Sequence, residues 1–154
     1  MYLAAIIAAN LTTAWIGPAI TPVNAFLFIG LDLTSRDNLH DTWNGRGLWP
    51  KMAALIATGS LISWLVNRNA GQIAIASFAA FALAGVADAI IYHLLRDRVR
   101  LVRVNGSNVV SAAVDSLVFP TLAFGGFLPL VTLGQFSAKV AGGFVWSFIL
   151  RERK

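Results

Sequence analysis

Residues 71–95, GQIAIASFAAFALAGVADAIIYHLL, form an apolar run with one acidic residue, Asp88, in its second half. A helix of about 20 apolar residues is long enough to cross the hydrocarbon core of a bilayer. An ionisable group at that depth costs about 2.5–3.5 kcal/mol on insertion scales. A chain that keeps such a group therefore places it inside a helical bundle, where it can meet a partner.

Two later runs repeat this pattern. Residues 107–127, SNVVSAAVDSLVFPTLAFGGF, contain Asp115, and residues 130–150, LVTLGQFSAKVAGGFVWSFIL, contain Lys139. Because these groups are expensive in lipid, they predict a polar cavity within the bundle. The alternative is a purely structural role, in which the aspartates and the lysine only hold the helices together.

The composition is typical of a membrane protein. Hydrophobic residues make up 57% of the chain, charged residues 12%, and the mean hydropathy is +0.70; soluble domains carry about 25% charged residues. The net charge of +5 comes from Lys and Arg residues that flank the apolar runs, so we expect no nucleic-acid partner. Cysteine is absent, which excludes disulfides and thiolate sites, and we expect no cofactor and no metal.

We predict an all-α, polytopic membrane protein with one transmembrane domain over residues 1–154. The six predicted spans are residues 2–16, 22–36, 49–67, 70–95, 107–126 and 128–151. The first two would cover only about 24 Å each, so a single span plus a re-entrant segment is the alternative for residues 1–36. Lys and Arg are concentrated in alternate loops, which predicts that both termini are cytoplasmic.

The spacing of the charged residues predicts a common cavity. Asp88 and Asp115 would each lie about eight residues, or roughly 12 Å, above the cytoplasmic ends of their spans. Lys139 would lie nearer the midplane and reach either carboxylate. The candidate substrate-binding residues on these faces are Asp88, Asp115, Lys139, Asn108, Ser77, Phe81, Gln135 and Asn10. Asp32 and Arg36, four residues apart, are a candidate gating or structural ion pair.

The count of charges inside the predicted bundle gives a further expectation. Three aspartates, Asp32, Asp88 and Asp115, face Arg36 and Lys139, which leaves a charge of −1. An uncompensated buried carboxylate takes up a proton or attracts a cation. A cationic substrate or a coupling proton would satisfy it.

Four segments together resemble the queuosine precursor transporters, also called the vitamin uptake transporter-like family. They are FLFIGLDLTSRD, ASFAAFALAGVADAIIYHLLR, GSNVVSAAVDSLVF and GQFSAKVAGGFVW, and the resemblance covers about residues 22–148. It implies a six-helix protein of the bacterial inner membrane that imports 7-deazaguanine bases for tRNA modification. The residues that match the family's polar pattern are Asp32, Arg36, Ser77, Asp88, Asn108, Asp115, Ser116 and Lys139. This chain departs from the family in two ways. It is shorter, and the stretch after Arg36, DNLHDTWNGRG, lacks the glycine that usually follows closely in relatives.

The resemblance adds Ser116 and Phe78 to the candidate site. A carboxylate can accept two N–H groups from the guanine-like edge of such a base, and Phe78 or Phe81 could stack on its ring. A vitamin or another purine-like base would also suit this cavity. The partners expected are therefore a small-molecule substrate and the lipid bilayer, and the chain could also form a homo-oligomer.

Two other classes of function stay open beside a secondary transporter. The chain could be the substrate-binding membrane subunit of an energised uptake complex; it has no ATP-binding loop, so another protein would supply the energy. An intramembrane aspartyl enzyme would need two aspartates that share a proton. The contexts GVADAI and AAVDSL do not resemble those proteases, so we expect no enzymatic activity.

Overall fold

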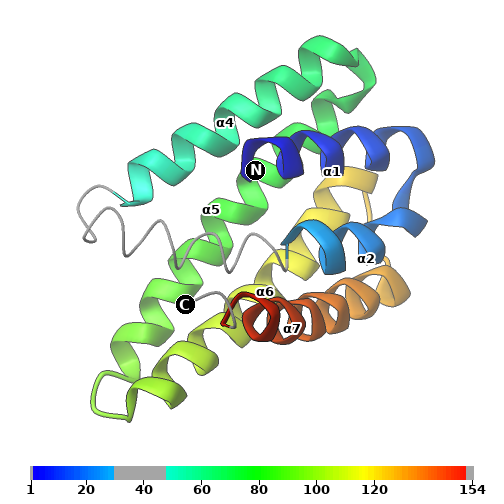
Figure 1. The fold of residues 1–154 in the computed structure, drawn as a ribbon. Coiled ribbons are helices and arrows are strands. Elements are labelled where there is room, and N and C mark those ends of the chain that lie inside the picture. Colours follow the sequence, from blue (N-terminus) through cyan, green and yellow to red (C-terminus); the bar gives the residue numbers. More distant parts are fainter. Residues whose placement is uncertain (1, 30–47, 152–154) are drawn as a thin grey trace.

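The computed structural model describes residues 2–29 and 48–151, and in these ranges it is helical throughout apart from short turns (Figure 1). This confirms the predicted all-α class. In chain order the elements are α1 (Tyr2–Ile16), the 3₁₀ turn η1 (Pro18–Ile20), α2 (Thr21–Asn24), the π-helical segment η2 (Ala25–Ile29), α4 (Leu48–Val66), the 3₁₀ turn η3 (Arg68–Ala70), α5 (Gly71–Leu94), α6 (Arg100–Phe124) and α7 (Pro129–Arg151).

Local sequence explains where the helices end. Gly17 adopts a φ of 90°, and Pro18 opens the next short helix, so α1 cannot continue. The Asn67 side chain accepts a hydrogen bond from the Asn69 amide at 3.0 Å, which caps η3 between α4 and α5. Gly125 ends α6 in the left-handed conformation, with a φ of 72°.

Most of the predicted spans agree with the helices. The first matches α1, and those over 49–67, 70–95 and 128–151 match α4, α5 and α7 within one residue at each end. The fifth is different, because α6 begins at Arg100, seven residues before the predicted start. Residues 30–36 of the second predicted span lie outside the described residues.

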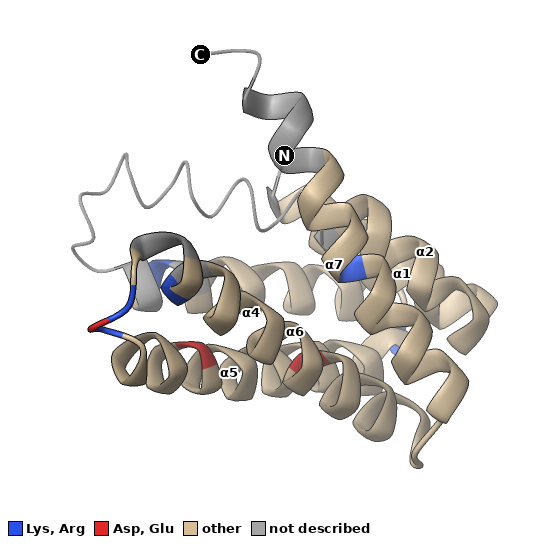
Figure 2. Cartoon of the chain, turned by 90° about the horizontal axis from the view of Figure 1, so that it is seen from below, with Lys and Arg blue, Asp and Glu red and all other residues tan. Residues whose placement is uncertain are grey.

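The long antiparallel pair α5 and α6 forms the body of the molecule (Figure 1). Helix α1 packs on α4 and α5, and the segment formed by α2 and η2 packs against α7, which also contacts α6. Charged residues gather at the end where α5 turns into α6, and few interrupt the helices elsewhere (Figure 2). The polar space of the bundle therefore lies between α1, α2, α5, α6 and α7.

The distribution of residue types is the reverse of that in a soluble core. Large side chains such as Ile75 and Leu130 are exposed. Among the residues whose burial the structure describes, the buried apolar ones are mostly alanines, and ten buried residues are polar or charged. The helices spanning Arg68–Leu94 and Asn105–Phe124 are long and apolar enough to cross a membrane. This pattern fits a bundle in lipid, where small and polar residues mediate helix contacts. The number of spans and the cytoplasmic termini stay predictions.

One close approach fixes the segment η2 against α7. A Cβ added at Gly142 would lie 2.8 Å from the Phe26 carbonyl oxygen and 3.3 Å from the Phe26 Cα. Both are backbone atoms and cannot rotate away. A Cβ added at Gly134, a second glycine of α7, would lie 3.1 Å from Cγ of the Pro22 ring. Glycines of α7 therefore set how closely the α2–η2 segment approaches it.

Gly142→Ala should destabilise the protein by about 1–3 kcal/mol, because the added methyl group must push η2 from α7. Gly126→Ala is the matched control, since its added Cβ meets no atom within 4 Å. Thermal unfolding in detergent measures both variants. Equal melting temperatures would show that η2 does not rest on α7 as described.

Candidate ligand-binding pocket

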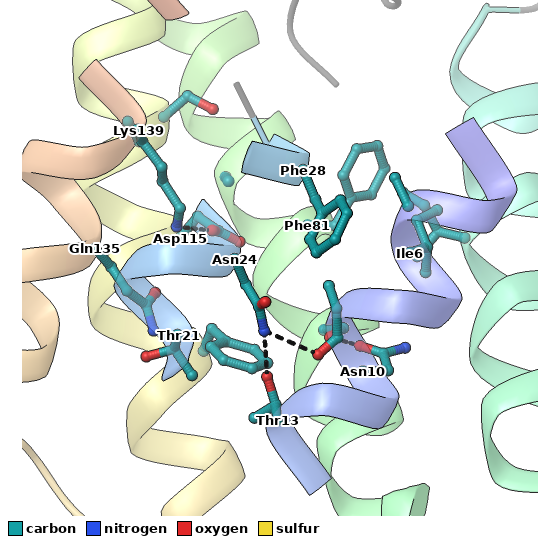
Figure 3. Close-up of a pocket in the computed structure, with 18 of the residues that line it drawn as sticks. Ile6, Asn10, Thr13, Thr21, Asn24, Phe28, Phe81, Asp115, Gln135 and Lys139 are labelled. Carbon is teal, nitrogen blue, oxygen red and sulfur yellow. Dashed lines mark hydrogen bonds and ion pairs between the residues drawn. The ribbon is translucent and has the colours of Figure 1, made fainter. Parts of the chain in front are cut away.

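A cavity of about 140 Å³ lies between helices α1, α2, α5, α6 and α7, with one contact from α4 (Figure 3). A single water needs roughly 10–15 Å³ of such space, so the cavity has room for a small molecule. The lining residues are Ala5, Ile6, Ala9, Asn10, Thr13, Thr21, Asn24, Phe28, Ile56, Ser77, Phe81, Ala84, Asn108, Ser111, Ala112, Asp115, Phe119, Gln135 and Lys139.

An ion pair between α6 and α7 forms one wall of this pocket. Lys139 Nζ donates to Asp115 Oδ2 and, at 3.0 Å, to Ser116 Oγ. The lysine is only 2% exposed, whereas the side chain of Asp115 is 23% exposed. Asp115 lines the pocket, and its Oδ1 receives no hydrogen bond from the described residues, so this oxygen remains available as an acceptor.

A proline in α6 changes the backbone hydrogen bonding next to Asp115. Pro120 lies inside the helix and is buried. Because proline has no N–H, the carbonyl oxygen of Ser116, four residues earlier, loses its intrahelical donor. This carbonyl oxygen belongs to the residue next to Asp115.

Asn10 connects three helices around the pocket. Its Oδ1 accepts a hydrogen bond from Ser77 Oγ of α5 at 2.8 Å, and its Nδ2 donates to Ser63 Oγ of α4 at 3.4 Å. Asn10 and Ser63 are both buried. In an apolar surrounding an unmade polar contact is costly, so this chain of bonds fixes the positions of α1, α4 and α5.

Asn24 has the same role between α1 and α2. Its Nδ2 donates to Thr13 Oγ1 at 3.0 Å (Figure 3). It also donates to Thr12 Oγ1 at 2.9 Å. Sequence analysis missed Asn24, Thr13 and Thr21 as lining residues. A signal was available: Thr13 follows Asn10 by three residues, and Asn24 follows Thr21 by three, so each pair shares a helix face.

Gln135 is a buried amide whose nitrogen is unpaired within the described part of the chain. It is 2% exposed and lies one turn from Lys139 on α7, and its Nε2 has no hydrogen-bond partner among the described residues. Its side chain runs from α7 toward Thr21 and the pocket (Figure 3). Leaving a buried donor unsatisfied costs about 1–3 kcal/mol. A ligand acceptor in the pocket would relieve that cost.

The structure brings together most of the residues predicted as substrate-binding. Ser116 contacts the site through Lys139, and Asp32 and Arg36 lie outside the described residues. Phe78 is exposed beside an outer groove between α4 and α5 and does not line the cavity. The predicted residues that line the cavity are Asn10, Ser77, Phe81, Asn108, Asp115, Gln135 and Lys139.

Asp88 does not line the cavity either, and the predicted equal depth of the two aspartates is wrong. Asp88 lies six residues before the end of α5 at Leu94, whereas Asp115 lies fifteen residues after the start of α6 at Arg100. The difference of nine residues is about 13 Å along the helix axis. Asp88 Oδ1 is buried and has no hydrogen-bond partner among the described residues. Its predicted role in ligand binding stays a prediction that the pocket lining does not support.

Residues 51–151 match the model of the family described as "Putative vitamin uptake transporter". The chain belongs to this family, which corresponds to the queuosine precursor transporters. Comparisons with curated proteins and with solved structures found no match. The matched segment contains α5, α6 and α7 with the Asp115–Lys139 pair. Together with the two helices that could span a bilayer, this membership indicates a membrane protein of the transporter type.

Lys139→Met should destabilise the protein by about 3–5 kcal/mol, because it leaves Asp115 partly buried without its cation. The double variant Asp115→Asn/Lys139→Met should recover much of the loss, since no uncompensated charge remains. Melting temperatures of the wild type, both single variants and the double variant form the test. Additive effects of the two single changes would contradict a coupled ion pair.

Proposed function

We propose that this protein imports a small planar nitrogenous base, a 7-deazaguanine precursor of queuosine, across the bacterial inner membrane. The observation that carries the proposal is a cavity walled by an ion-paired carboxylate, amide groups and aromatic rings. Family membership supports transport as the kind of activity.

The pocket offers complementary groups to such a base. The unbonded oxygen of Asp115 can accept N–H groups from a guanine-like edge, and the amide of Gln135 can donate to a ring carbonyl. Phe81 and Phe119 line the same cavity and can cover the faces of a flat ring. A few polar groups in a largely apolar cavity are typical of small-molecule sites.

The geometry favours transport over aspartyl catalysis. An acid–base dyad requires two carboxylates close enough to share a proton. Asp88 and Asp115 differ in depth by about 13 Å, and Asp115 already holds Lys139. The same cavity would also serve a binding subunit of an energised complex, so uptake by cells that express this chain alone separates the two.

Asp115→Asn should abolish import, because the amide keeps the volume but loses the charge that holds Lys139 and one acceptor for the base. The measurement is the queuosine content of tRNA in bacteria that cannot make the precursor and receive it at low concentration. Asp97→Asn, the same chemical change on a carboxylate that is 88% exposed in the α5–α6 turn, is the matched control. If cells that express the wild-type protein contain no queuosine in their tRNA, the proposed ligand is wrong. If the Asp115→Asn variant imports as well as the wild type, the proposed site is wrong.

Asp88→Asn should leave binding of the base to purified protein within about threefold of wild type, a change below about 0.7 kcal/mol. The reason is that Asp88 does not line the cavity. Equilibrium binding in detergent, with Asp115→Asn measured in parallel, gives the comparison. A loss as large as that of Asp115→Asn would restore the two-carboxylate site that the sequence alone predicts.

A further inference from the structure

We propose that the outer groove between α4 and α5 binds one phospholipid with a negatively charged headgroup, whose acyl chain lies in the groove and whose phosphate lies at Arg68. This groove and the candidate pocket have no lining residue in common. The inference goes beyond import of a base and does not depend on it.

The groove is apolar and is formed largely by small side chains. Its lining residues are Ala57, Ser60, Leu61, Trp64, Gly71, Ala74, Ile75, Phe78 and Ala79. The hydroxyl of Ser60 already donates to the Ala74 carbonyl oxygen at 3.3 Å. Leu61 and Ile75 are more than half exposed, so their side chains meet the surroundings of the bundle. In a bilayer those surroundings are acyl chains, and residues 57–64 of α4 provide about 10 Å of groove for a segment of one chain.

A cation lies at the end of the groove where α4 joins α5. Cζ of Arg68 lies 3.9 Å from the centroid of the Trp64 ring, which is within the range of a cation–π contact. The indole also lies close to Gly71, because a Cβ added there would be 3.0 Å from Trp64 Cδ1. Trp64 therefore lines the groove and carries the guanidinium on its ring. Tryptophan is enriched at the level of lipid headgroups, so a phosphate is expected at this height.

The turns around Arg68 supply no counter-ion. Its guanidinium makes no hydrogen bond or salt bridge with the described residues. Helix α1 contacts η3, and the Gln72 side chain donates to the Leu122 carbonyl oxygen at 3.1 Å, so the turns at 17–20, 67–70 and 125–128 share one end of the bundle. Arg68 is the only charged residue in these three turns.

This isolated cation selects the kind of lipid. A guanidinium can donate two parallel hydrogen bonds to the oxygens of one phosphate. A zwitterionic headgroup also carries an ammonium, which Arg68 would repel, whereas a glycerol headgroup leaves the phosphate charge uncompensated. The groove and the cation together therefore favour an anionic phospholipid over a zwitterionic one.

A second copy of the chain fits the groove less well. A two-fold interface places the same surface on both copies, so a concave groove of small residues would face itself and leave a void. With the two-fold axis along the membrane normal, both copies would also bring Arg68 to the same end without a carboxylate.

Photocrosslinking in nanodiscs tests the site directly. The discs contain phosphatidylethanolamine and a small fraction of phosphatidylglycerol that carries a diazirine near the glycerol end of one acyl chain. Peptide mass spectrometry should find labels in the groove about fivefold above those on the α7 face with Leu130 and Leu133, which are 85% and 62% exposed. Unlabelled phosphatidylglycerol should compete for the groove, and the same amount of added phosphatidylethanolamine should not.

Variants separate the cation from the groove. Arg68→Gln should lower groove labelling about fivefold, and Arg98→Gln in the exposed α5–α6 turn is its control. Ala57→Leu should fill the groove and lower labelling while Arg68 is intact. Ala141→Leu, the same change at an exposed position of α7, is the control. Size-exclusion profiles establish folding, and if a variant does not fold, the wild-type labelling and competition decide.

Three results would overturn the proposal. They are equal labelling of the groove and the α7 face, equal competition by the two lipids, and groove labelling that folded Arg68→Gln leaves unchanged. An unlabelled groove in a protein that mass photometry shows to be a dimer would assign the groove to a second copy instead. Because no base is used, failure of the proposed import leaves this test unaffected.

Discussion

The ion pair between Asp115 and Lys139 is the interaction on which the interior of this bundle depends. Neither charge is tolerable alone in an apolar interior, and each supplies the other's counter-ion. The pair joins α6 to α7, and Ser116 adds a second contact to the lysine. Asp115 also lines the pocket and keeps one oxygen without a hydrogen bond from the described residues, so the same residue joins two helices and has an acceptor available to a ligand.

The rest of the cavity is kept open by contacts between small and polar residues. Asn10 links α1 to α4 and α5, and Asn24 links α1 to α2. Glycines at positions 134 and 142 of α7 let the α2–η2 segment approach closely. In lipid there is no hydrophobic force between helices, so packing and hydrogen bonds of this kind decide their arrangement. Large apolar side chains are then free to face outward, as Ile75 and Leu130 do.

Gln135 has a different place in this arrangement. The other buried amides, those of Asn10 and Asn24, have partners from neighbouring helices, but the Gln135 nitrogen has none among the described residues. A polar group that is left unsatisfied in a packed interior is expensive for stability. Gln135 lines the pocket one turn from Lys139. In the import that we propose, it is the donor that the transported base meets, which would connect a cost in folding to a function in binding.

The sequence by itself determined the helical class, the membrane character and the family, because long apolar runs with rare charges have few other solutions. It also identified Asp115, Lys139, Gln135 and Asn10 as inward-facing, since the helical period places polar residues on one stripe. The predicted equal depth of Asp88 and Asp115 was wrong because α6 begins at Arg100, in a charged stretch that looks like a loop, so that Asp115 lies further from the start of its helix than expected. The contribution of Thr13, Thr21 and Asn24 was missed because α1 and α2 are short and their contacts depend on how the chain turns at Gly17. Only the tertiary structure decided which charges share a cavity, because that depends on where each helix begins and on how the helices cross, and neither is encoded in the period of one segment.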